Sequence, residues 1–556
     1  MKKFLFVALA IFTLLIITAC SATTENSNKT ANKQAASSES AASESPKILR
    51  GPNITLVAEK GTQKLSNGVT VPVWTFNGSA PGPEIHVQKG QKVRVTLKNE
   101  LSAPVSIHWH GYPVPNKMDG IPGVTQNAVA PGKSFTYEFV ADKAGTYWYH
   151  SHQDSVNQVD RGLYGAFIVE DPKEKYDKDY TLMLDEWMTD KNQINSQIKA
   201  MTPAGQSNKN NGDSGMGSMP GMDMGGSDQG SSNSGGSSGM NMDNMDNSSS
   251  DSGNSNGMNM PGNMMADNMS MYDLYTINGK SGSLVKPLTV KKGDNVRLRF
   301  INAGYLPHNI HIHGHNIKVI ATDGQPINNP LAVKNQVISI APGERYDVAF
   351  TADNPGKWYI EDHGTAKGTN GMKALIDYEG SKATTDQPNA STQLPAINFA
   401  DYGSKTKPEF TLNQKYDVTY TMNLNAGMNN NGMIYTINGK TFPNTDPIKV
   451  KTGDRVKVKL VNRDHMNNHP MHLHGHFFQV LSKNGKPVSG SPIYKDTLNV
   501  KPGETYEVAF LADNPGNWLF HCHDLHHANA GMITEVQYTD FHSSYVPSSS
   551  SNNKPE

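Results

Sequence analysis

Apolar and polar residues alternate in short stretches along most of the chain. Runs such as VRVTL at 93–97 and VKVKL at 456–460 present every second side chain to one face, as a half-buried β-strand does. Gly, Pro and Asn separate these runs at a spacing typical of a β-sandwich, and no segment requires a long helix. The pattern therefore predicts an all-β protein.

The strand pattern is itself repeated along the chain. YTINGK at 275–280 recurs at 435–440, and KKGDNVRLRFIN at 291–302 matches KTGDRVKVKLVN at 451–462. A looser copy, QKGQKVRVTLKNE, stands at 88–100. We therefore predict three Greek-key β-sandwich domains. Their expected bounds are 51–188, 271–385 and 386–545.

The N-terminus has the features of an export signal. Met1-Lys2-Lys3 precedes an apolar run from Phe4 to Ile17, which is too short to span a bilayer. The run ends in Ile-Thr-Ala-Cys, similar to a bacterial lipobox, so we expect residues 1–19 to be removed and Cys20 to be lipidated. Residues 20–50 would then be a tether that holds the protein to the outer face of the cell membrane. The alternative is an ordinary cleaved signal with an incidental cysteine.

Charge and cysteine content exclude several classes of protein. The formal net charge is −1 over 556 residues, which gives no indication of a nucleic-acid partner. Besides Cys20 the chain has one cysteine, Cys522, so an exported protein of this sequence has no disulfide framework. Cys522 is therefore available to bind a metal. We expect a monomer that meets the membrane only through its lipid.

Residues 189–270 have a different composition from the rest of the chain. They are rich in Gly, Ser and Asn and are predicted to be a disordered insert. Of the 25 methionines, 14 fall between Met201 and Met271. Thioethers favour Cu(I), so we predict copper capture, against the alternative of an incidental linker. The candidate Cu(I) ligands are the M-x-M pairs Met222 and Met224, Met240 and Met242, and Met258 and Met260.

Four short blocks carry most of the metal-binding residues. They are HWH at 108–110, HSH at 150–152, HPMHLHGH at 469–476 and the segment 521–532 that begins with HCH. An H-x-H pair on a strand presents both rings to one face, and the four blocks together supply eight such imidazoles. Eight are too many for one metal ion and too many to bury without partners. The pattern predicts a cluster of three metal ions.

Cys522 adds a soft ligand to the fourth block. Together with His527 and Met532 it can hold a blue-type copper, which takes imidazole, thiolate and a weak axial thioether. Because side chains alternate along a strand, Cys522 should face one site while His521 and His523 face another. One tripeptide would then connect two metal sites.

These four blocks, in this order, resemble the copper-ligand motifs of the three-domain multicopper oxidases, which are laccase-like enzymes. The resemblance covers the mature chain apart from the tether and the insert, and it implies cupredoxin-like domains and four copper ions. The implied type 1 ligands are His469, Cys522 and His527, with Met532 axial. The implied type 2 ligands are His108 and His472. The implied type 3 ligands are His110, His150 and His523 for one copper, and His152, His474 and His521 for the other.

The resemblance implies an oxidase that takes electrons singly from a reductant and reduces O2 to water. The insert is similar to the methionine-rich segments of bacterial copper-resistance oxidases, so we predict Cu(I) as the favoured substrate and a role in copper tolerance. A general laccase acting on small phenols, or an Fe(II) or Mn(II) oxidase, is the alternative. A non-catalytic copper-binding lipoprotein and a copper nitrite reductase are further alternatives, but neither accounts for all eight histidines.

Two acidic residues are candidates for proton supply. Asp119, nine residues after His110, matches the family's acid near the type 2 copper, although an Asp-Gly turn would look the same. Many bacterial relatives carry a Glu where this chain has Ala528, and Asp524 is the candidate substitute.

Four residues near the type 1 ligands are candidates for a substrate-metal entry site, against the alternative of solvated polar residues. They are Asp464, His465, Met466 and His526.

The middle domain has lost the blue-copper ligands. In the repeat alignment EDH at 361–363 stands opposite HCH at 521–523, and Lys367 stands opposite His527. Without the thiolate no blue copper can form, so we predict a spacer, with adventitious metal binding as the alternative. The other aligned residues are His308, His311, His313, His315 and Met372.

Overall fold

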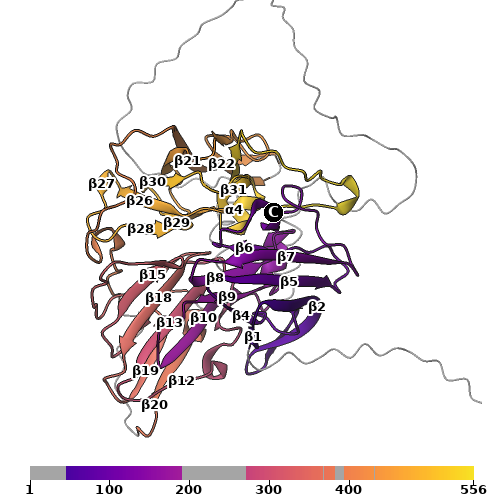
Figure 1. Ribbon diagram of the computed structural model, residues 1–556. Coiled ribbons are helices and arrows are strands. Elements are labelled where there is room, and N and C mark those ends of the chain that lie inside the picture. Colours follow the sequence, from indigo (N-terminus) through magenta and orange to yellow (C-terminus); the bar gives the residue numbers. More distant parts are fainter. Residues whose placement is uncertain (1–45, 191–270, 367, 382–392, 431) are drawn as a thin grey trace, which may run out of the picture. The chain divides into compact units, whose positions relative to one another are not determined.

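The computed structural model describes residues 46–190, 271–366, 368–381, 393–430 and 432–556. Cys20, Lys367 and the six M-x-M methionines lie outside the described residues. Six sheets form three successive β-sandwiches (Figure 1), which confirms the all-β prediction. In the described part of the chain, every helix is too short or too polar to cross a bilayer.

The first sandwich combines a four-stranded and a five-stranded sheet. The alternation in β5 buries Val93, Val95 and Leu97 between them. One sheet has the order β3-β2-β5-β7, with β2 (Asn53–Ser66), β3 (Val69–Phe76), β5 (Gln91–Asn99) and β7 (Ser134–Ala141). The other has the order β1-β4-β9-β8-β6, with β1 (Ile48–Arg50), β4 (Glu84–Gln88), β6 (His108–His110), β8 (Gly145–His150) and β9 (Tyr164–Glu170).

The second sandwich combines a six-stranded and a five-stranded sheet. The first has the order β11-β10-β13-β18-β15-β16, with β10 (Lys178–Trp187), β11 (Leu274–Ile277), β13 (Asn295–Asn302), β15 (Lys318–Thr322), β16 (Gln325–Pro326) and β18 (Arg345–Thr351). The second has the order β12-β20-β19-β14-β17, with β12 (Leu288–Val290), β14 (His308–Ile312), β17 (Ile338–Ile340), β19 (Lys357–Asp362) and β20 (Lys373–Tyr378).

The third sandwich repeats this plan. One sheet has the order β22-β21-β24-β30-β26-β27, with β28 beside β26; its strands are β21 (Val418–Asn429), β22 (Gly432–Ile437), β24 (Arg455–Asn462), β26 (Phe478–Lys483), β27 (Lys486–Pro487), β28 (Ile493–Lys495) and β30 (Thr505–Leu511). The other has the order β23-β32-β31-β25-β29, with β23 (Ile448–Val450), β25 (His469–Leu473), β29 (Thr497–Val500), β31 (Asn517–Cys522) and β32 (Ile533–Tyr538).

Short helices connect the strands. Among the described residues, the α-helices are α1 (Ser155–Asp160) and α4 (Leu525–Asn529), and the 3-10 turns are η1 (Asn116–Met118), η2 (Gly282–Leu284), η3 (Thr369–Gly371), η4 (Phe399–Asp401) and η5 (Ser549–Ser551). The side chain of Asp524 caps α4 by accepting a hydrogen bond from the backbone N–H of His526. This cap fixes the turn that brings His527 back beside β31.

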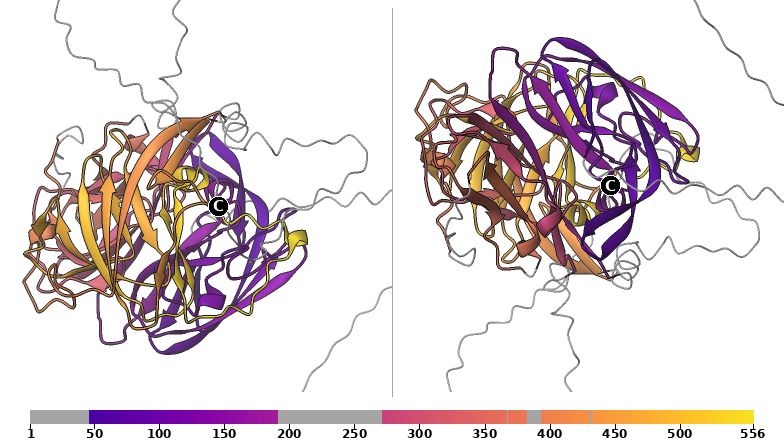
Figure 2. Two further views of the ribbon diagram at one scale, coloured as in Figure 1. Left: turned by 90° about the horizontal axis from the view of Figure 1, so that it is seen from above. Right: turned by 90° about the horizontal axis from the view of Figure 1, so that it is seen from below.

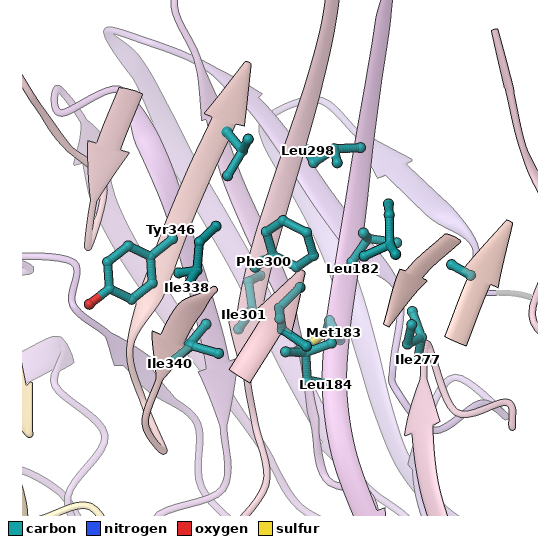
Figure 3. Packing of buried hydrophobic residues seen from close by; sticks show 14 of the residues in the cluster. Leu182, Met183, Leu184, Ile277, Leu298, Phe300, Ile301, Ile338, Ile340 and Tyr346 are labelled. Carbon is teal, nitrogen blue, oxygen red and sulfur yellow. The ribbon is translucent and has the colours of Figure 1, made fainter. Parts of the chain in front are cut away.

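Strand β10 corrects a predicted boundary. The expected first domain, 51–188, included it, but β10 pairs in parallel with β13 and antiparallel with β11 in the second sandwich (Figure 1). Leu182 and Leu184 of β10 lie in the same core as Phe300 of β13 (Figure 3). Periodicity identifies a strand but not its partner, which is why the boundary was misplaced. The methionine-rich insert therefore connects two adjacent strands of one sheet, as the short turn between β21 and β22 does in the third sandwich.

Candidate metal centre

Eight buried histidines from the first and third sandwiches meet in one cluster. β6 and β8 place His108 opposite His150, while β25 and β31 place His472 opposite His521. The two strand pairs face each other, because the ring of His108 stacks on that of His474 with centroids 4.0 Å apart. Each of the eight side chains is at most 2% exposed. The members are His108, His110, His150, His152, His472, His474, His521 and His523.

The cluster contains three overlapping sets of three histidines. Within each set the possible ligand atoms all lie within 4.8 Å of one another. Two sets coincide with the predicted type 3 ligands, and a third contains the predicted type 2 pair. The sets are His110, His150 and His523; His152, His474 and His521; and His108, His110 and His472.

Protein acceptors hold the outer nitrogen of several rings. His108 Nδ1 donates to the backbone oxygen of Asp119 at 2.9 Å, and His474 Nδ1 donates to Asp119 Oδ2 at 3.0 Å. His150 and His521 each donate Nδ1 to a backbone carbonyl at 2.9 Å. Such contacts fix the tautomer and point Nε2 inward, as is usual for histidines that bind metals. Asp119 thus lies where the sequence placed it, beside the predicted type 2 site.

Several inward nitrogens have no hydrogen-bond partner among the described residues. They include Nε2 of His108, His150 and His472, Nδ1 of His110, and both ring nitrogens of His523. Burial, together with the neighbouring His472 and His523, holds the pKa of His110 well below its usual range, so the ring is neutral. Buried neutral imidazoles without partners are costly unless a metal ion binds them, so this donor set fits copper.

A buried ion pair beside the cluster was not predicted. Arg345 of β18 in the second sandwich donates from both Nη atoms to Asp496 of the third sandwich, at 2.7 and 2.6 Å. The same carboxylate lies 3.3 Å from His110 Nε2 and from His472 Nδ1. Gly111 leaves room for the guanidinium, because a Cβ at this residue would collide with Arg345. Arg345 of the second sandwich therefore holds the carboxylate that lies beside two histidines of the cluster.

A separate set of possible ligands, which we call the Cys522 set, lies around Cys522. Its Sγ is 3.8 Å from Nδ1 of His469 and 3.6 Å from Nδ1 of His527, and all three side chains are buried. Burial raises the pKa of the Cys522 thiol, so a bound cation is what would keep it as a thiolate. Met532 is fully buried beside this set, and its backbone N–H donates to His527 at 3.0 Å. One cysteine, two imidazoles and a nearby thioether fit a blue-type copper.

The Cys522 set and the histidine cluster lie on opposite faces of β31. Cys522 packs in the core of the third sandwich, whereas His521 and His523 lie in the histidine cluster. The side-chain alternation expected from the sequence therefore operates here. Tyr435 stacks on His527 with ring centroids 3.8 Å apart.

The other candidate residues lie near the Cys522 set. Asp464 Oδ2 is 3.6 Å from His469 Nε2, and Met466 is 71% exposed. Burial raises the pKa of Asp464, but hydrogen bonds from His469 and Asn467 outweigh it and hold that pKa below its usual range. His465 is exposed and His526 is half-buried. These four candidates therefore combine an anionic group with an exposed thioether.

Asp524 lies beside His527 of the Cys522 set. Its Oδ2 is 3.4 Å from His527 Nε2, and its Oδ1 accepts from the backbone of His526. Its contacts therefore favour positioning of His527 over proton supply to the histidine cluster.

The C-terminal segment reaches the histidine cluster, which no sequence pattern indicated. His152 Nδ1 donates to the backbone oxygen of Pro555 at 2.5 Å, and Glu556 Oε1 lies 3.2 Å from His152 Nε2. Asn553 Oδ1 accepts from the backbone N–H of Ala128 in the first sandwich at 2.9 Å. The C-terminal end lies beside strands of the first sandwich in both views of Figure 2. Residues 553–556 thus cover one side of the cluster.

The second sandwich has different chemistry at the position of the Cys522 set. His308 Nδ1 donates to Asp362 Oδ2 at 2.9 Å, and His308 Nε2 lies 2.5 Å from Glu186 Oε1. Burial lowers the pKa of His308, but the two carboxylates outweigh it and raise that pKa to about 10. A charged imidazole between two carboxylates therefore stands where the third sandwich has soft ligands.

Comparisons with known proteins agree with this geometry. Family models described as multicopper oxidase match residues 57–174, 241–381 and 409–541. The chain is 29% identical over 497 residues to multicopper oxidase MmcO of Mycobacterium tuberculosis, covering 85% of this chain and 84% of that protein. It is 26% identical over 570 residues to copper resistance protein A of Escherichia coli, covering 83% and 89%.

Solved structures share the fold. Fet3p, described as a multicopper oxidase that functions in iron import, superposes with a TM-score of 0.67 at 21% identity, covering 91% of this chain and 94% of that one. The laccase from Botrytis aclada superposes with a TM-score of 0.63 at 22% identity, covering 89% of each chain.

Proposed function

The chain belongs to the multicopper oxidase family, and from this premise we propose that it couples the one-electron oxidation of Cu(I) to the reduction of O2 to water. The observation that carries the proposal is the tripeptide of residues 521–523. It contributes a thiol to one ligand set and two imidazoles to the adjacent sets, so a single strand connects the site of electron entry with the site of O2 reduction.

The chain offers ligands for four copper ions. We propose His469, Cys522 and His527 with axial Met532 as the type 1 ligands, and His108 with His472 as the type 2 ligands. The proposed type 3 ligands are His110, His150 and His523, and His152, His474 and His521. Four bound coppers would supply four one-electron centres, as many electrons as the reduction of one O2 to water requires.

Residues around the cluster position the histidines and exclude water. Asp119 accepts hydrogen bonds from His108 and His474, and it is 1% exposed. We propose that the carboxylate of Asp119, whose Oδ1 lies 3.1 Å from His108 Nδ1, relays protons for O2 reduction. Asp524 instead orients His527 and is proposed as a positioning residue.

Two features support Cu(I) as the substrate. The insert holds over half of the chain's methionines, and thioethers are ligands that select Cu(I). Among the relatives, copper resistance protein A has a name that refers to copper tolerance. We propose that Met222, Met224, Met240, Met242, Met258 and Met260 collect Cu(I), and that Met466 and Asp464 receive it near His469.

We further propose that the protein is an exported, monomeric lipoprotein held at the outer face of the cell membrane through Cys20. Replacing Cys20 by Ala should release the protein from the membrane fraction or block its processing, because acyl chains would provide the anchor. Unchanged membrane association of the variant would remove this part of the proposal.

Oxygen consumption tests the function. Steady-state rates with Cu(I), Fe(II), Mn(II) and a small phenol should be highest for Cu(I) at limiting concentration. Deleting residues 216–269 should lower the Cu(I) rate and weaken copper tolerance, while phenol oxidation without added copper stays equal or rises. A loss that is equal on both substrates would mean that the insert supports the fold. No loss of rate on either substrate would favour the alternative of a general laccase.

A further inference from the structure

Four metal-binding side chains remain on one face of the second sandwich. β14 and β19 pair so that His311 lies directly opposite Glu361. Because strand side chains alternate, the residues two positions further on, His313 and His363, extend towards the same face. The third sandwich has the same register, where β25 and β31 place His472 opposite His521. The second sandwich therefore keeps the arrangement that the third contributes to the histidine cluster, with a carboxylate replacing one imidazole.

Three ligand atoms of this face lie close together. His313 Nε2 is 2.8 Å from Glu361 Oε1 and 3.3 Å from His363 Nε2, and His363 Nε2 is 4.0 Å from Glu361 Oε1. The three side chains are at most 8% exposed. Backbone hydrogen bonds fix both histidines, from His313 N–H to Tyr359 and from His363 N–H to Asn309, each at 2.9 Å. The spacing is as compact as that of the three-residue sets in the histidine cluster.

The fourth residue is oriented to complete the set. His311 Nδ1 donates to the backbone oxygen of Gln336 at 2.9 Å, which leaves a lone pair on Nε2. Its ring centroid lies 4.4 Å from that of His313 and 5.2 Å from that of His363.

A hydrogen-bonded polar network without metal would also hold Glu361, since Lys373 Nζ lies 2.7 Å from its Oε2. That network, however, leaves Nδ1 of His313 buried without a partner among the described residues. It also brings two imidazole Nε2 atoms to 3.3 Å, where at most one can donate to the other. Two or three imidazoles and one carboxylate are instead a donor set that divalent ions of borderline hardness prefer.

We propose that His313, His363 and Glu361, together with His311, form a fifth metal site, in the second sandwich, that binds Zn(II) or Cu(II). Its donor set has no sulfur, so it differs in selectivity from the Cys522 set. It shares no ligand with the proposed copper sites, and binding here does not depend on oxidase activity.

Zinc binding to the copper-loaded enzyme tests the proposal. Enzyme that holds four copper ions per chain is titrated with ZnCl2 by calorimetry, and the metals are then counted by mass spectrometry after dialysis. We expect one tightly bound zinc per chain with the blue absorption unchanged. Residues that only orient ligands are worth about 10- to 100-fold in affinity, so Glu361→Gln and His313→Asn should each weaken zinc binding at least about tenfold. The control His542→Ala removes an exposed histidine and should leave the affinity unchanged.

Two results would overturn the site. Wild-type enzyme that takes up no zinc beyond its copper, or equal affinity in Glu361→Gln and wild type, excludes it. If the variants do not fold, zinc X-ray absorption on the wild type decides instead. Nitrogen and oxygen neighbours with imidazole scattering support the site, and sulfur neighbours, which would place zinc at Cys522, overturn it.

Discussion

The second and third sandwiches carry the same strands but opposite chemistry at one position. In the third, Cys522 lies between the imidazoles of His469 and His527. In the second, Asp362 takes the place of the thiol and holds His308 as part of an ion pair with Glu186. Burial lowers the pKa of His527 to about 3, whereas the carboxylates raise that of His308 to about 10. Similar burial thus gives a neutral ligand in one domain and a fixed cation in the other, so the metal site depends on a few side chains and not on the fold.

The largest effect should come from removing the thiol. Cys522→Ser is expected to abolish both the intense blue absorption and the oxidase activity, because a hydroxyl is a poor ligand for copper and gives no such band. Far-ultraviolet circular dichroism should show intact sandwiches. The matched change Asp362→Asn should leave the blue band in place. A blue Cys522→Ser protein would contradict the assignment.

The next effect concerns the link between the two sandwiches. Arg345→Ala leaves the buried Asp496 carboxylate without its cationic partner, which typically costs about 3–5 kcal/mol in the free energy of unfolding. Denaturant unfolding measures this. Lys440→Ala removes an exposed pair with Asp446 and should cost no more than about 1 kcal/mol. Equal effects of the two changes would mean that the second sandwich is not held through Arg345.

A smaller effect should depend on pH. The folded-state pKa of His308 is about 10, above the ordinary value, so its charge stabilises the fold fully below about pH 6.5 and progressively less as pH rises towards 10. The difference in unfolding free energy between wild type and His308→Gln should therefore shrink over that window. A difference that stays constant from pH 6 to pH 10 would show that His308 is not charged in the folded protein.

The smallest effect should come from the two equivalent methionines. Met532→Leu conserves volume, so it should cost less than about 1.5 kcal/mol of stability. It should nevertheless raise the potential of the blue site, because the weak axial ligand is lost. Spectroelectrochemistry follows this change. Met372→Leu, the counterpart in the second sandwich, should leave the potential unchanged.

Much of the site could be predicted from the sequence because its ligands are spaced by strand geometry. H-x-H pairs such as His108 and His110 predict ligands on one face of a strand. H-C-H at 521–523 predicts ligands on both faces. The repeats then predict that these strands belong to similar sandwiches. Local periodicity was sufficient for each of these inferences.

The features that sequence reasoning missed depend on contacts between distant segments. Nothing near Arg345 indicates that Asp496 will be its partner, and nothing near Glu556 indicates that it will lie beside His152. The pairing of β10 was missed for the same reason. Hydrophobic pattern fixes which side of an element is buried, but not which element covers it.

The histidine cluster also determines when the site can form during synthesis. His110 contacts Thr497 across 387 positions of the chain. Domains generally fold in order from the N-terminus, so the first sandwich is complete long before its partners in the third have been made. Its four cluster histidines therefore stay open to solvent until residues 469–523 fold against them. Metal loading of the cluster is thus a late step in maturation, and a chain that stops short of residue 472 would contain a finished first sandwich with only half of a cluster.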